Sequence, residues 1–149
     1  LIEKAQKNIY LATRYTDVNV TEAILRCLDR GVEIYILDGD KKNLSSRVQL
    51  IRLVLSNPLK VKRFYQLFHS TNVHIKYIDL PYSFIAVDNR YVGLELINPL
   101  RNEFFIGLFL ENEFLANKLI EIFHELYEKA VEDPLKAFAK KIKTQKVQL

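Results

Sequence analysis

Two carboxylates, Asp38 and Asp40, follow the apolar run of residues 32–37 and are the first candidates for chemistry. Open α/β sheets bind ligands beyond the carboxyl ends of their strands, and neighbouring carboxylates suit a divalent cation. No third ligand is visible beside them, and Asp-Gly-Asp is also an ordinary turn sequence. We therefore expect a turn at this point, and neither a metal nor another cofactor.

The histidines and the cysteine are the next candidates. His69, His74 and His124 fall on a predicted loop, strand and helix, and none has an obvious serine, cysteine or carboxylate partner for a triad. Cys27 lies on the apolar stripe of a predicted helix, with no nearby cation or helix N-terminus to lower its pKa. A single cysteine also excludes an internal disulfide and a cysteine zinc cluster. We therefore expect surface or structural roles for the three histidines and a place in the core for Cys27.

Charge is segregated along the chain, although the net charge is only +4. Residues 41–78 carry eight basic side chains and no acid, and residues 134–149 carry five lysines and no acid. Such a distribution can steer an anionic partner, whereas a charged face more often serves only solvation. The candidate contacts to an anion or nucleic acid are Lys41, Lys42, Lys60, Lys62 and Arg63.

The hydrophobic pattern predicts the elements that position these groups. A strand over residues 9–12, a helix with its N-cap at Asn19 and its end at Gly31, and a strand over residues 32–37 form a βαβ unit. The two strands are therefore expected to be parallel. Two helices and a third strand are predicted next, over residues 44–55, 59–68 and 73–78.

A hairpin and a long helix occupy residues 82–130. Apolar runs over residues 84–87 and 91–97 flank Asp-Asn-Arg, which is turn chemistry. The run over residues 103–110 is continuous enough to predict a strand that is buried on both faces. From Asn112, a plausible N-cap, apolar residues recur at helical spacing.

This order of elements resembles the C-terminal half of a phospholipase D-like domain. In that family an HxKxxxxD strand is followed by GSxN, a further strand and a long helix. Only Asp88 and Asn98 match the motif residues. The family histidine and lysine fall on Pro81 and Ser83, and the glycine and serine fall on Glu95 and Leu96.

The resemblance implies an α/β fold, with a phospholipase D-like mixed sheet of about six strands sandwiched between helices. It argues against an enzyme, because the family nucleophile and the phosphate-binding lysine are both replaced. Two motif copies meet at a groove in this family, so a homodimer is expected. Asp88 and Asn98 could instead simply hold turn backbones. The candidate pocket residues for a small hydroxylated or anionic ligand are Arg14, Tyr82, Ser83, Asp88 and Asn98.

The resemblance also suggests a context. Archaeal transcription regulators of the TrmB type carry a winged-helix DNA-binding domain, a linker helix and a phospholipase D-like domain that dimerises or senses a ligand. The chain has no methionine at position 1, and residues 1–7 read as the end of an upstream helix. We therefore expect a fragment whose DNA-binding domain lies outside this sequence.

Two other functions are alternatives to a regulatory module. One is a catalytically dead nuclease-family domain that binds nucleic acid or another polyanion through the basic segment. The other, an active phosphodiesterase that uses His74, is rejected. Residues 1–133 are assigned to the domain and 134–149 to a basic tail. Without an apolar run of about 18 residues or a signal peptide, we expect no membrane association and a cytoplasmic location.

Overall fold

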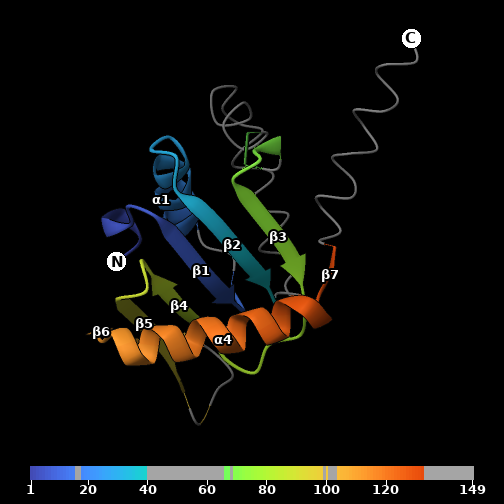
Figure 1. The fold of residues 1–149 in the computed structure, drawn as a ribbon. Coiled ribbons are helices and arrows are strands. Elements are labelled where there is room, and N and C mark those ends of the chain that lie inside the picture. The colour runs from blue at the N-terminus through green and yellow to red at the C-terminus, as the bar shows by residue number, and fades with distance from the viewer. Residues whose placement is uncertain (16–17, 40–65, 68, 99, 101–103, 133–149) are drawn as a thin grey trace.

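The computed structural model describes residues 1–15, 18–39, 66–67, 69–98, 100 and 104–132. In these residues a seven-stranded sheet has the order β6-β5-β4-β1-β2-β3-β7, and the long helix α4 lies across it (Figure 1). The elements are η1 (Ile2–Lys4), β1 (Asn8–Thr13), α1 (Val18–Leu28), β2 (Glu33–Asp38), β3 (Val73–Tyr77), β4 (Phe84–Val87), β5 (Tyr91–Ile97), β6 (Phe104–Glu111), α4 (Glu113–Lys129) and β7 (Val131–Glu132).

The sheet is mixed, as the sequence predicts. β1, β2 and β3 are parallel, which confirms the βαβ prediction. β4, β5 and β6 add as an antiparallel series beside β1. The seventh strand, β7, is the short segment that pairs with β3 directly after α4. Consequently β1 and β5 end, and β4 starts, at the same end of the sheet's strands.

Among the described residues, α1 packs on one face of the sheet and α4 packs on the other. Side chains that alternate along the strands, such as Ile9, Ile34 and Val87, form a core with α1. The side chains on the other face of the sheet, which include Leu37 and Val92, pack on Phe123 and its neighbours in α4. This alternation explains why strands in the middle of the sheet are buried on both faces. Among the described residues, no helix is long and apolar enough to cross a membrane.

Cys27 lies in the α1 core and is fully buried. Its thiol donates to the carbonyl of Ile2 at 3.2 Å, and Arg30 Nη2 lies 3.1 Å from its Sγ. The expectation that no cation lies nearby was therefore wrong, because Arg30 follows by about one helical turn. Burial nevertheless raises the pKa of the Cys27 thiol, against the opposing effect of Arg30.

The predicted caps and turns have mixed outcomes. Asp88 and Asn89 adopt positive φ angles of 53° and 55° in the β4–β5 hairpin, as side chains that tolerate the left-handed region can do. Asn112 is the N-cap of α4, since its side chain accepts from the amide of Leu115 at 2.9 Å. The N-cap prediction for Asn19 is wrong, because α1 already begins at Val18.

β6 is the main difference from the sequence-based expectation. A strand buried on both faces is predicted there, but β6 lies at the edge of the sheet. Ile106, Leu108, Phe109 and Leu110 are all exposed. A continuous apolar run indicates a strand, but its burial depends on neighbours that the run itself does not specify.

Candidate functional site

The candidate site begins where β1 ends and β4 starts. Ser83 Oγ accepts from the amide of Arg14 at 3.1 Å, and the carbonyl of Ser83 accepts from the amide of Glu95 at 3.0 Å. Arg14 Nη1 also donates to the carbonyl of Pro81 at 3.1 Å. Tyr82 lies beside them with 40% of its surface exposed. The structure thus brings Arg14 and Ser83 together as predicted, and adds Glu95.

Glu95 is the centre of this site, although only 1% of its side chain is exposed. Its Oε2 accepts from the amide of Ser83 at 2.6 Å, and its Oε1 accepts from the hydroxyl of Tyr15 at 2.8 Å. Arg14 Nη1 lies 3.9 Å from Glu95 Oε1. Burial of an ionised carboxylate is costly unless donors and a cation compensate it. We call Arg14, Tyr15, Ser83 and Glu95 the Glu95 cluster.

Asp88 is not part of this cluster. It lies beyond the other end of β4, about 16 Å from Ser83 at the usual strand rise. Its carboxylate accepts from the amides of Gln6 and Lys7 at 2.8 Å and of Asn8 at 3.0 Å. The five predicted pocket residues therefore do not form a single pocket, because opposite ends of β4 hold Ser83 and Asp88.

Asn98 lies just after β5, at the same end of the strands as Ser83. Its Oδ1 accepts from the amide of Leu100 at 2.9 Å. This contact and the three amide contacts of Asp88 correspond to the alternative in which both side chains hold backbone turns.

Glu95 and Tyr15 were missed as site residues. The available signal was an acid within an apolar strand, Leu94-Glu95-Leu96, at the position where the resembled family has glycine. Tyr15 follows Arg14 directly, yet its hydroxyl bond spans 80 positions, so no local pattern could reveal it.

The histidines lie away from the Glu95 cluster. The His74 ring stacks on Tyr35 with centroids 4.7 Å apart, and Tyr35 stacks on Tyr10 at 5.0 Å. His124 packs edge-on against Tyr10 at 5.4 Å. β1 and β2 separate β3 from β4, so His74 lies about 14 Å from β4 at the usual strand spacing.

Tyrosine pKa values reflect this packing. Burial, with Tyr35 and Glu33 as further causes, raises the pKa of Tyr10, and burial beside Tyr35 raises that of Tyr127. Lys76 Nζ donates to the carbonyl of Tyr127 at 2.9 Å. These rings therefore stay neutral and serve as packing groups at physiological pH.

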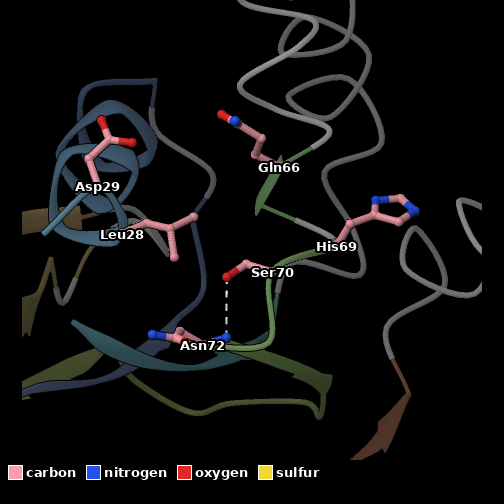
Figure 2. A pocket seen from close by; sticks show the side chains of 6 residues that line it. All are labelled: Leu28, Asp29, Gln66, His69, Ser70 and Asn72. Atoms are coloured by element: carbon pink, nitrogen blue, oxygen red, sulfur yellow. Dashed lines mark hydrogen bonds between the residues drawn. The ribbon is translucent and has the colours of Figure 1, made fainter. Parts of the chain in front are cut away.

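A pocket of about 370 Å³ lies beside the start of β3, at the other end of the strands from the Glu95 cluster. Figure 2 shows Leu28 and Asp29, from the end of α1, facing the segment that leads into β3. Ser70 Oγ accepts there from the amide of Asn72 at 3.2 Å. None of the predicted pocket residues lines it. The full lining is Leu28, Asp29, Gln66, His69, Ser70 and Asn72.

The remaining candidates are the Asp38–Asp40 pair and the basic residues proposed to contact an anion. Asp38 ends β2, and its carbonyl accepts from the amide of Ile78 at 3.2 Å. Within the described ranges, no three His, Cys, Asp or Glu side chains gather closely enough to hold a metal ion. The other candidates, for metal or anion contacts, lie outside the described residues: Asp40, Lys41, Lys42, Lys60, Lys62 and Arg63.

No family model and no curated protein matches the chain. Among solved structures, TrmBL2, an archaeal chromatin protein with a novel mode of DNA binding, superposes with a TM-score of 0.63 at 20% identity. The match covers 89% of this chain and 47% of TrmBL2, so the chain spans about half of that protein.

Two further structures share the architecture. Nuc of Salmonella typhimurium, a phospholipase D family member, gives a TM-score of 0.61 at 15% identity over 89% of this chain and 85% of Nuc. The phosphatidylserine synthase of Haemophilus influenzae Rd KW20 gives 0.52 at 17% identity, over 98% of this chain and 41% of the synthase. The chain therefore has a phospholipase D-like fold, as its sequence predicts.

Proposed function

We propose that this phospholipase D-like chain is a non-catalytic module that dimerises within an archaeal DNA-binding regulator. The observation that carries the non-catalytic part is the Glu95 cluster. At the positions of the family nucleophile and lysine stand Pro81, whose carbonyl is bound by Arg14, and Ser83, whose amide is bound by Glu95. A buried carboxylate beside these positions repels an anionic phosphodiester. The distance of His74 from β4 supports the same proposal.

An exposed apolar surface supports dimerisation. Leu96 and Ile106 face each other across β5 and β6, and Leu108 follows on the same side. Exposed apolar patches mark interaction sites, and an edge strand offers unpaired backbone groups. Five exposed apolar residues lie on or near these two strands, and we call them the apolar edge. They are 38% to 91% exposed: Leu96, Ile97, Leu100, Ile106 and Leu108.

A second copy of the chain is the partner that we propose for the apolar edge. β6 carries no charge from Phe104 to Leu110, and the charge at its end, Glu111, pairs with Arg90 of the same chain. Two copies can therefore meet around a twofold axis without like charges facing each other. Exposed Tyr82 lies at the same end of the strands as Leu96 and Ile97, among the motif positions through which the resemblance implies a homodimer.

The regulator context rests on the likeness to TrmBL2 and on the half-length match. DNA binding would then belong to residues outside this chain. Ligand sensing is the second candidate, because the pocket beside Asp29 has room for a small molecule. A coding region without a helix-turn-helix ahead of residue 1 would contradict the regulator context.

The solution mass tests dimerisation. We expect a dimer for the native chain and a monomer for Ile106→Lys, because a lysine at the interface is desolvated without a partner. Val131→Lys, on the other edge strand and 60% exposed against 50% for Ile106, is the matched control and should stay dimeric. A monomeric native chain would refute dimerisation. A dimer unchanged by Ile106→Lys would refute this interface.

Hydrolysis of a chromogenic phosphodiester tests the non-catalytic part. We expect the same rate as in buffer for the native chain. Hydrolysis that disappears on His74→Ala would contradict the proposal, since it would assign the family chemistry to a histidine outside the motif.

A further inference from the structure

We infer that the hydroxyl of Tyr15, the amide of Ser83 and the guanidinium of Arg14 form an anion-binding site, which Glu95 fills from within the chain. This site lies inside one chain, so the inference is independent of dimerisation.

Contacts that do not involve the Glu95 carboxylate hold two of the three donors, Arg14 and Ser83. Tyr15 and Arg14 follow β1, whereas Ser83 precedes β4, and the bond from the Arg14 amide to Ser83 Oγ joins the two segments. Arg14 Nη1 is held separately by the carbonyl of Pro81. β5 supplies the carboxylate, and the backbone amide of Glu95, which every side-chain variant keeps, donates to the carbonyl of Ser83. Removal of the Glu95 side chain should therefore leave a preorganised set of donors.

The donor set specifies the class of anion. A neutral amide, a phenol and one cation reach both oxygens of the Glu95 carboxylate, at 2.6 and 2.8 Å, with Arg14 Nη1 at 3.9 Å. This arrangement matches the charge and size of a small carboxylate. Of the described residues, Arg14 is the cation that a dianionic phosphate would face here.

The space beside Glu95 favours the same ligand. A pocket of about 110 Å³ adjoins Glu95 and Ser83 and is otherwise lined by apolar or glycine residues. It can hold the methyl or ethyl group of acetate or propionate. Those other lining residues are Leu11, Phe84, Ile85, Gly93, Leu94, Gly107 and Phe109.

Native Glu95 competes with any such ligand at the high effective concentration of a tethered group. The native chain is therefore closed to small anions at this position. A ligand that acts here would have to displace Glu95 first.

Anion rescue of Glu95→Ala tests the inference. We expect Glu95→Ala to have a lower Tm than the native chain, because the amide of Ser83 and the hydroxyl of Tyr15 lose their hydrogen bonds to the Glu95 carboxylate. Sodium acetate and propionate should raise the Tm of this variant saturably, by several degrees. Sodium chloride at the same ionic strength should not, and sodium phosphate should be less effective than acetate.

Three controls identify the site. The native chain and Glu111→Ala, which removes an exposed carboxylate, should show the same small response to acetate and chloride. Adding Tyr15→Phe to Glu95→Ala should weaken the acetate response. If Glu95→Ala does not fold, acetate should restore its circular dichroism spectrum. Equal effects of acetate and chloride on either readout would overturn the inference.

Discussion

Asp88 shows how one carboxylate can organise a backbone. It accepts from three successive amides, those of Gln6, Lys7 and Asn8, at 2.8 to 3.0 Å. Its positive φ of 53° turns the chain so that the side chain returns to the start of β1. The carboxylate therefore fixes where the first strand begins.

We expect Asp88→Ala to lower the free energy of unfolding by about 2 kcal/mol, because a charged acceptor with several amide donors is lost. Asp88→Asn keeps one acceptor oxygen and the tolerance for positive φ, so it should lose less. Urea denaturation measures both. Asn98→Ala, which removes a single exposed contact, is the control, at about 0.5 kcal/mol. Equal stability of Asp88→Ala and the native chain would refute this role.

For single residues, the sequence predicts the local role of a side chain better than its hydrogen-bond partners. It places Asp88 at a turn and names the backbone role as an alternative. It cannot identify the amide donors, which lie 80 to 82 positions away. Likewise, it shows that Glu95 replaces a glycine of the resembled motif. Only the fold brings Tyr15 and Ser83 to its carboxylate.

Gly93 determines how closely β5 packs against side chains of the neighbouring strands β4 and β6. A Cβ at this position would lie 2.6 Å from Ile85 Cγ2 and 3.1 Å from Phe109 Cε1. The missing side chain therefore allows the Phe109 ring to lie close to the strand. Gly93 is thus a packing glycine.

Gly93→Ala should cost about 1 to 3 kcal/mol of stability, the usual range for overpacking a core. Gly31→Asn is the control, since Gly31 has a φ of +78° but no atom within 4 Å of its Cβ position. Asparagine accepts that conformation, so a cost of about 1 kcal/mol or less is expected. Thermal unfolding of both variants measures the difference. A similar loss in the two would contradict the steric explanation.

The elements themselves are largely predictable, because periods of two and 3.6 residues are local properties. The βαβ unit, the hairpin and the start of α4 at Asn112 are confirmed. The burial of β6 could not be predicted, because it depends on whether a further strand follows in the sheet. β7 has only two residues, too few for any period to be recognised.

The charge of the whole molecule motivates the alternative function. Under our proposal, DNA is read outside this chain, so we expect no measurable duplex binding at physiological salt. At low salt, any weak binding should be unchanged in a variant with glutamine at positions 60, 62 and 63. A variant that changes Lys4, Lys7 and Lys129 to glutamine removes the same charge and is the control.

Fluorescence anisotropy across a salt series measures this binding. Affinity that persists at physiological salt and falls about tenfold or more only when Lys60, Lys62 and Arg63 are replaced would favour the polyanion-binding alternative. The control variant distinguishes contacts of the basic segment from an effect of net charge.

The position of β1 in the sheet has a consequence for how the chain folds. β1 pairs with β2 after a short crossover, and β4, β5 and β6 pair with their sequence neighbours. Among the ladders of the described residues, β1–β4, from Ile9↔Val87 to Ala12↔Phe84, pairs the strands that lie farthest apart in the sequence. It therefore carries the largest loop-closure entropy of these ladders. Asp88 closes one end of this ladder and the Glu95 cluster the other, so the two carboxylate sites stabilise the least local of the described strand pairings.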